Sequence, residues 1–462
     1  MKLAIAVQRY GAEINGGAEL HARYIAERLA RHAEVEVVTT CARDYVSWRN
    51  EWPAGVESIN GVRVRRFPVR RERTPDDFGR HSRRVFECRH SIADEIAWVD
   101  SEGPTSPALV DYLVRRAPDV DFVILFSYRY YHAWRGARAV SRKAVLVPTA
   151  ERDPAIGLSI FGPTFRGVRA VMYNSHEERA MIHAAARNDD VPGVVVGVGS
   201  EVPERTDPER FRRKHGVRRP FAVYVGRIDE NKGCGELFRY FHQYAATFVR
   251  GLDLVLVGSA IMPVPKHPRI RHLGFLDDRD KFDAIAAADL LIMPSYFESL
   301  SMVALEAWAL GRPVLANGRC DVLKGQCIRS GAGLYYESYE EFAETLYALE
   351  SNGPLHARLG ANGREYFRTH YAWPVVERKY LDVLQRLARE GAGRDIEPLP
   401  GWFNRHRRIL APAQEVLAGI PGGAVNSQLP TSHSQGDRSR ATGINLGVGS
   451  WELGVDTKRT WK

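Results

Sequence analysis

Residues 290–311, LLIMPSYFESLSMVALEAWALG, contain a short apolar strand, a polar loop and a helix. The strand, Leu290–Met293, is an uninterrupted apolar run, which is typical of a parallel sheet covered on both faces. The helix, Val303–Leu310, ends at Gly311, a residue that commonly terminates helices. Open α/β sheets bind ligands at the carboxyl ends of their strands. The loop between this strand and helix is therefore the first place where the sequence predicts a ligand site.

The same strand–loop–helix unit repeats along the chain. A polar, proline-bearing stretch at Gly197–Pro208 separates two sets of units, and helical stretches such as Glu236–Phe248 and Asp280–Ala287 lie between the strands. The alternation predicts an α/β protein with two doubly wound, Rossmann-like halves of similar size. Further strands are predicted at Lys2–Val7, Glu34–Thr39, Phe122–Phe126, Ala144–Val147, Val171–Asn174, Val194–Val196, Phe221–Val225, Asp253–Val257, Arg271–Phe275 and Pro313–Ala316.

This organisation predicts four parts of the chain. They are an N-terminal domain over 1–200, a C-terminal domain over 201–374, a crossover helix over 375–395 and an extension over 396–462. Residues 421–462 are rich in Gly, Ser, Thr and Asn and have little periodic apolar content. Such a composition buries too little apolar surface to fold, so we expect disorder there.

Composition and charge exclude several classes of protein. With 44% hydrophobic and 26% charged residues, the 462-residue chain is neither wholly disordered nor fibrous. No apolar run approaches the roughly 20 residues that span a bilayer, and Leu3–Val7 is too short for a secretory signal. We therefore expect a cytoplasmic protein. The net charge of +9 favours anionic partners, but without a nucleic-acid-binding motif we expect no nucleic-acid partner.

Cysteine usage also fits the expectation of a cytoplasmic protein. The five cysteines form no CxxC pair, so a disulfide framework or a structural zinc site is not expected.

A glycine pair follows the first predicted strand. Gly16 and Gly17 lie where a helix begins, and backbone N–H groups at a helix N-terminus attract phosphate. The same pair is also common in plain turns. It is not a GxGxxG fingerprint, which argues against an enzyme linked to NAD.

A second loop carries two cations. Gly226-Arg227 ends a strand, and Lys232 lies at the start of the next helix. Both charges are therefore expected at the carboxyl edge of the sheet. Such a pair can neutralise a diphosphate without a metal ion; the alternative is two solvated cations in a loop. Glu298 and Glu306 lie in the opening loop and helix, where carboxylates either accept sugar hydroxyls or form a solvated helix face.

Together these segments resemble the retaining glycosyltransferases of family 4, also called group 1. Residues 298–314 resemble the E-x7-E segment of that family, residues 226–233 its diphosphate loop, and residues 16–19 its N-terminal glycine loop. Residues 272–276 look like the strand end where the family holds the nucleotide base. The resemblance covers residues 1–390. It implies the GT-B fold, in which two Rossmann-like domains face a central cleft and C-terminal helices pack back toward the N-terminal domain.

The resemblance also implies a role for each matching residue. Arg227 and Lys232 would hold the diphosphate, Glu298 the hydroxyls of the donor sugar, and Glu306 those of the nucleoside ribose. No cofactor and no metal are expected, since the nucleotide sugar is itself a substrate. The remaining donor-binding positions are Gly16, Gly17, Gly226, Phe275, Ser299, Leu300 and Ser301.

One departure from the family concerns the N-terminal domain. Many members carry a histidine after one of its strands, in a segment that resembles residues 148–150, but here Glu151-Arg152-Asp153 follows. Either Glu151 or Asp153 replaces the histidine as a catalytic group, or both form an ion network with Arg152.

The implied activity is metal-independent, retaining hexosyl transfer from a nucleotide-diphosphate sugar. A UDP-sugar is favoured and a GDP-sugar is the second choice. The acceptor would be a hydroxyl of a glycan, a lipid-linked molecule or a small molecule, in polysaccharide, glycolipid or glycoconjugate biosynthesis. A sugar-nucleotide epimerase and a non-catalytic sugar-nucleotide-binding protein are the alternatives. A metal-dependent GT-A enzyme needs a DxD after a strand, and the DVD at 119–121 precedes one.

An arginine-rich segment in the first half allows a membrane partner. Arg63–Arg73 interleaves arginines with Val64, Phe67 and Val69. Basic clusters attract anionic lipids, so one reading is peripheral contact with the inner face of the plasma membrane. The other is a solvated strand edge and loop.

Overall fold

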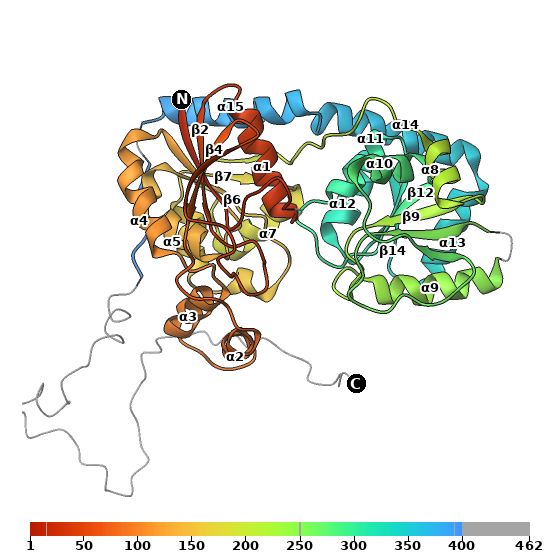
Figure 1. Cartoon of the computed structure of the whole chain (residues 1–462), viewed down its shortest axis with the longest axis horizontal. Coiled ribbons are helices and arrows are strands. Elements are labelled where there is room, and N and C mark those ends of the chain that lie inside the picture. Colours follow the sequence, from red (N-terminus) through yellow and green to blue (C-terminus); the bar gives the residue numbers. More distant parts are fainter. Residues whose placement is uncertain (15, 249–250, 392, 400–462) are drawn as a thin grey trace, which may run out of the picture. The chain divides into compact units, whose positions relative to one another are not determined.

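The computed structural model describes residues 1–14, 16–248, 251–391 and 393–399 (Figure 1). The disorder predicted for residues 421–462 lies outside the described residues. Two sheets organise the described part of the chain, in strand orders β3-β4-β2-β1-β5-β6-β7-β8 and β11-β10-β9-β12-β13-β14.

The first sheet is parallel except for one hairpin. Its β3–β4 pair is antiparallel, whereas β2 pairs in parallel with both β1 and β4. The strands are β1 (Lys2–Ala6), β2 (Glu34–Thr40), β3 (Gly55–Ile59), β4 (Val62–Phe67), β5 (Phe122–Phe126), β6 (Ala144–Val147), β7 (Ala170–Tyr173) and β8 (Gly193–Val195). The helices are α1 (Gly17–Leu29), α2 (Pro75–Phe86), α3 (Ile92–Glu102), α4 (Pro107–Arg116), α5 (Tyr131–Ala139), α6 (Phe161–Gly167) and α7 (His176–Ala186).

The second sheet is parallel in every strand pair. Its strands are β9 (Phe221–Val225), β10 (Asp253–Val257), β11 (Ile270–His272), β12 (Leu290–Met293), β13 (Val314–Asn317) and β14 (Gly333–Tyr336). The helices are α8 (Pro208–His215), α9 (Cys234–Thr247), α10 (Asp278–Ala287), α11 (Met302–Ala309), α12 (Asp321–Ser330), α13 (Tyr339–Ser351) and α14 (Gly353–His370). The two sheets confirm the predicted pair of Rossmann-like halves.

The last described helix, α15 (Trp373–Arg389), returns to the first half of the chain. The Tyr380 hydroxyl lies 3.3 Å from Nε2 of His21 on α1, and burial lowers the pKa of that histidine to about 3. Arg28 of α1 pairs with Glu377 at 3.3 Å. The crossover helix is therefore fixed to α1 by buried polar contacts as well as by packing.

The sequence missed the β3–β4 hairpin, and the reason is visible in β4. Val62 and Val64 are buried, while Arg63 and Arg65 on the other face pair with Glu36 of β2. The arginines hide a regular strand alternation, and β4 is an interior strand rather than an edge.

Another difference concerns the predicted strand Arg271–Phe275. β11 ends at His272, and Gly274 has a φ of +73°, a left-handed conformation that strand residues rarely adopt. Phe275 consequently lies beyond the strand, with 67% of its surface exposed.

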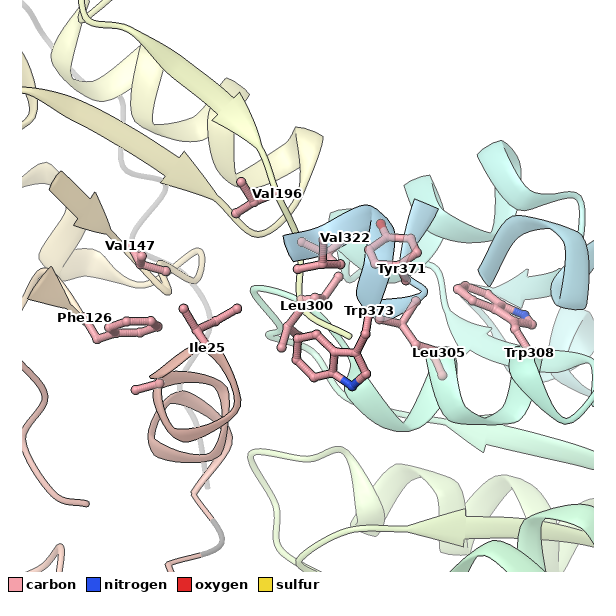
Figure 2. Packing of buried hydrophobic residues seen from close by; sticks show 14 of the residues in the cluster. Ile25, Phe126, Val147, Val196, Leu300, Leu305, Trp308, Val322, Tyr371 and Trp373 are labelled. Carbon is pink, nitrogen blue, oxygen red and sulfur yellow. The ribbon is translucent and has the colours of Figure 1, made fainter. Parts of the chain in front are cut away.

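The largest buried cluster contains side chains from both sheets and from the helices that cover them (Figure 2). Trp308 of α11 is fully buried in it, and its indole N–H donates to the Ala332 carbonyl at 2.9 Å. α11 follows β12 directly, so its packing fixes the direction of the loop that precedes it.

Trp308→Ala is expected to lower the free energy of unfolding by about 3–5 kcal/mol, since it removes a large buried side chain and leaves a cavity. Ile328→Ala is the matched control because Ile328 is 62% exposed, and it should change stability by less than about 0.5 kcal/mol. Chemical denaturation of both variants measures the difference, and equal losses would contradict this account of the core.

Candidate functional site

A cavity of about 820 Å³ lies at the carboxyl ends of strands from both sheets. Loops after β1, β5, β6 and β7 line one side, and loops after β9 and β12 line the other. The predicted site residues among its lining are Gly16, Gly17, Glu151, Gly226, Arg227, Lys232, Glu298, Ser299, Leu300 and Ser301. Phe275 and Glu306 are not among the residues that line it.

Lys232 and Glu298 are in direct contact inside this cavity. Lys232 Nζ lies 2.8 Å from Glu298 Oε1, and both side chains are largely buried. Burial alone would lower the pKa of Lys232, but Glu298 more than offsets it and the pKa is raised. The ammonium is therefore charged at neutral pH. Its ion pair with Glu298 connects the loop after β9 to the loop after β12.

Asp229 organises the loop after β9, a role the sequence analysis did not assign. Its buried carboxylate accepts hydrogen bonds from Arg227 Nε and, at 2.8 Å, from the backbone N–H of Lys232. Burial alone would lower the pKa of Arg227, but Asp229 more than offsets this effect and the pKa is raised. The signal was present in the spacing, because an aspartate three residues before an N–H often accepts from it in a turn.

Gly233 lets this loop approach β12 closely. It has a φ of +73°, and a Cβ at this position would lie 2.1 Å from the Pro294 carbonyl oxygen. Only a residue without a side chain fits there, so the glycine sets the distance between Lys232 and the loop that carries Glu298.

Gly233→Ala is expected to push the two loops apart and to weaken binding of a diphosphate anion in this cavity by at least about tenfold, because Lys232 moves away from Glu298. Gly353→Ala is the matched control, since a Cβ on Gly353 meets nothing within 4 Å. Isothermal titration of both folded variants tests the expectation. Unchanged affinity in Gly233→Ala would contradict it.

The start of α11 faces the cavity through Ser299, Leu300 and Ser301. Ser301 caps the helix by accepting from the Ala304 N–H at 3.3 Å. Ser295, which the sequence analysis did not single out, also lines the cavity, and its buried hydroxyl has no protein partner among the described residues. Hydroxyl and backbone donors thus gather beside Lys232.

Glu306 is held by protein groups behind the cavity lining. Its Oε1 accepts from Ser200 Oγ at 2.8 Å and lies 3.1 Å from Lys281 Nζ. Its Oε2 is buried, with no hydrogen-bond partner in the described part of the chain. One carboxylate oxygen is therefore unpaired in that part of the chain, but it lies behind the residues that line the cavity.

The glycine pair is shaped by Glu19 on the first turn of α1. A Cβ on Gly16 would lie 2.1 Å from Glu19 Oε2, so a larger residue here would displace this carboxylate. Glu19 Oε1 accepts from Nε and Nη2 of Arg9 at 2.8 and 2.6 Å. The buried Arg9–Glu19 ion pair therefore lies at the N-terminus of α1, beside the cavity.

The three charged residues that replace the expected histidine have different partners. Asp153 pairs with Arg129 at 2.6 Å, and Arg152 pairs with Asp321 at 3.1 Å. Glu151 lines the cavity, and its pKa is raised by burial and by Glu298, although Lys232 acts in the opposite direction.

Glu178, at the start of α7, supports the loops that follow β6 and β7. Its carboxylate accepts from the backbone N–H groups of Ala150 and Asn174, both at 2.5 Å. Burial raises the pKa of Glu178 to about 8. The loop that carries Glu151 therefore depends on a buried carboxyl group that titrates near neutral pH.

The raised pKa of Glu178 predicts a pH-dependent stability. Between the unfolded value of about 4.5 and the folded value of about 8, the folded state binds more protons, so stability falls as pH rises, by at most about 1.4 kcal/mol per pH unit. Glu178→Gln resembles the protonated form and should flatten this slope. Urea unfolding from pH 5 to 9 measures the stability of the wild type and of Glu178→Gln. The same dependence of stability on pH in both proteins would contradict a raised pKa of Glu178.

The arginine-rich segment offers little apolar surface to a membrane. Val64 and Val69 are buried in the fold, and Arg66 and Arg73 pair with Glu57 and Glu102. Among the described helices, none is both long and apolar enough to cross a bilayer.

Residues 206–366, which include both cations and both glutamates, match the family model described as Glycosyl transferases group 1. This segment belongs to that family. D-inositol 3-phosphate glycosyltransferase of Corynebacterium glutamicum is 29% identical over 234 residues, which are 45% of this chain and 54% of that protein. The chain spans about half the length of the first curated relatives it matches.

Solved structures share the fold of the group 1 segment and of the sheet that precedes it. Sucrose-phosphate synthase from Thermosynechococcus elongatus has a TM-score of 0.62 at 16% identity, covering 84% of this chain and 100% of that chain. Anabaena HepE in complex with UDP-glucose has a TM-score of 0.59 at 18% identity, with the same coverage. The predicted GT-B architecture is confirmed.

Proposed function

We propose that this protein is a retaining glycosyltransferase that moves a sugar from a nucleotide-diphosphate sugar to a hydroxyl acceptor. The observation that carries the proposal is the arrangement of Arg227 and Lys232 on one loop of the cavity, where Asp229 holds both residues and Lys232 contacts Glu298. Two cations beside a helix N-terminus suit a diphosphate. A carboxylate next to them suits the hydroxyls of the attached sugar.

The two cations do the work that a divalent ion does in other transferases. At an effective dielectric constant of about 20, each cation about 4 Å from a phosphate oxygen contributes roughly 4 kcal/mol before desolvation. That attraction grows as negative charge collects on the departing diphosphate, so it favours the transition state. Arg227 and Lys232 are paired with Asp229 and Glu298, but their side chains are 45% and 32% exposed, so a phosphate can contact them without breaking these pairs.

Retention of configuration follows from attack on the same face that the diphosphate leaves. The acceptor hydroxyl approaches the anomeric carbon beside the β-phosphate, and a phosphate oxygen takes its proton as the new bond forms. This pathway uses no dedicated protein base. Glu298 orients the donor sugar by accepting hydrogen bonds from its hydroxyl groups.

Glu151 adjusts the charge of the donor site. With Glu151 ionised, Asp229, Glu151 and Glu298 outnumber the two cations before any phosphate arrives. Burial and Glu298 raise the pKa of Glu151, which favours its protonated form. In that form the carboxyl would donate a hydrogen bond to a donor-sugar hydroxyl.

The donor is proposed to be a UDP-sugar, with a GDP-sugar as the second choice. The Anabaena relative in fold was solved with UDP-glucose, which supports the first choice. Glu306 would contact the ribose through its unpartnered oxygen, and Phe275 would lie near the base. The acceptor would be a glycan, lipid-linked or small-molecule hydroxyl on the side formed by the first sheet.

Arg227→Ala and Lys232→Ala are each expected to reduce turnover by roughly 10²-fold or more, the loss typical of a transition-state charge contact. Arg368→Ala, which removes a 73%-exposed side chain, is the matched control and should leave turnover unchanged. Near-normal turnover in both variants would refute the proposed site.

The assay should separate the nucleoside diphosphate, the intact donor and any isomerised donor by chromatography. A transferase releases the nucleoside diphosphate when an acceptor is present. Isomerised donor without acceptor would indicate an epimerase, and binding without turnover a sugar-nucleotide-binding protein.

A further inference from the structure

The first-sheet side of the cavity presents an exposed aromatic ring. Tyr45, which follows β2, lines the cavity with 42% of its surface exposed. Its ring meets Trp48 edge-on, with centroids 6.3 Å apart, and lies 5.7 Å from the guanidinium carbons of Arg9 and Arg73. Packing on three neighbours holds the ring in place while one part of it stays open to the cavity.

Tyr45 also lies near the proposed diphosphate site. Tyr45 and Arg227 line the same cavity, and Tyr45 is among the groups, after Asp229, that raise the pKa of Arg227 against the effect of burial. A molecule stacked on Tyr45 would therefore lie beside the leaving phosphate, where the acceptor hydroxyl has to be.

The first charged group around Tyr45 is a closed ion pair. Arg9 donates through Nε and Nη2 to Glu19, and its Nη1 donates to the Arg43 carbonyl at 2.8 Å. All three nitrogens of this guanidinium are therefore engaged by protein oxygens.

The second charged group is a chain of four residues that line the cavity. Glu102 pairs with Arg73 through one oxygen and with Arg129 through the other, both at 3.0 Å. Arg129 also pairs with Asp153 at 2.6 Å, and Arg73 Nε donates to the Val46 carbonyl at 2.7 Å. Glu102 is buried, so its two arginines compensate a charge that water does not reach.

Across both groups, three arginines face three carboxylates, so this side of the cavity has no excess positive charge. Glu151 adds negative charge when ionised, and His21 is neutral because burial lowers its pKa to about 3. Arg9 and Arg73 are only 12% and 10% exposed, unlike Arg227 at 45%, so a phosphate monoester placed here would have to draw an arginine away from its buried carboxylate, which is costly. A sugar hydroxyl can donate to a carboxylate oxygen without breaking the pair.

We propose that the acceptor is an uncharged polyhydroxylated ring that stacks on Tyr45 and donates hydroxyl hydrogen bonds to the compensated carboxylates Glu19 and Glu102. The aromatic face supplies apolar contact for the C–H side of the ring. The ion pairs select against acceptors that carry phosphate at the end of the ring that enters the site. This inference rests on the proposed transferase function, because it describes the second substrate of the same cavity.

Binding to the full-length protein saturated with UDP tests the proposal, since UDP keeps phosphate probes out of the donor site. The probes are glucose, mannose and myo-inositol, each compared with its phosphate monoester by calorimetric titration. The wild type is expected to bind an uncharged ring at least about tenfold more tightly than its phosphate. Tyr45→Ala should weaken that binding about tenfold, and Tyr45→Phe, which keeps the aromatic face, should stay within about twofold.

A gain-of-function variant tests the charge argument independently. Glu102→Gln leaves Arg73 and Arg129 with one carboxylate fewer, so phosphate monoesters should bind at least about tenfold more tightly than to the wild type. Glu19→Gln makes the same test at Arg9 if the first variant does not fold.

Tighter binding of a phosphate monoester than of its parent ring by the wild type would overturn the proposal. Wild-type affinity in Tyr45→Ala, or no gain for phosphates in either glutamine variant, would also overturn it. Failure of the wild type to bind UDP or GDP would instead contradict the proposed function, so the two failures can be told apart.

Discussion

The contact between the Lys232 ammonium and the Glu298 carboxylate is the constraint on which the site depends. It joins two loops that leave neighbouring strands, β9 and β12, at the same edge of one sheet. The contact is close because Gly233 lies against the Pro294 carbonyl, and it is directed because Asp229 binds the backbone N–H of Lys232. A phosphate that enters the cavity finds a charge whose position has already been fixed by the protein.

The two sides of the cavity use charge differently. The second sheet supplies Arg227 and Lys232, which remain close to the cavity surface and suit a ligand of high negative charge. Both sets of cations are paired with carboxylates, but Arg9 and Arg73 of the first-sheet side are only 12% and 10% exposed, whereas Arg227 and Lys232 are 45% and 32% exposed. One side is therefore suited to a diphosphate and the other to hydroxyl groups, which is the division of labour that transfer from a charged donor to an uncharged acceptor requires.

Most of the fold and much of the site could be predicted because local patterns specify them. Continuous apolar strands such as Phe122–Phe126 and Leu290–Met293 are visible as runs, and the loop after Leu290–Met293 carries Glu298. β4 was missed because its outward face is made of arginines, which resemble a basic loop until Glu36 is seen beside them. Tertiary context, not local preference, decides such a strand.

The site residues that sequence could not supply act through partners distant in the chain. Glu178 supports the loop of Glu151, and Glu102 connects Arg73 to Arg129; neither belongs to a short motif. Phe275 lies beyond β11, which ends early because Gly274 turns the backbone, and its contact with a nucleotide base stays a prediction.

The central claim is that an arginine and a lysine, rather than a metal ion, hold the diphosphate. Titration of UMP and UDP in the presence of EDTA, into the wild type and into Arg227→Ala and Lys232→Ala, tests it most directly, with GMP and GDP used if guanine nucleotides bind better. The account predicts that the wild type prefers the diphosphate by at least about a hundredfold and that each variant loses at least about tenfold of that preference. An undiminished preference in both variants, or a wild-type preference that disappears in EDTA, would contradict it.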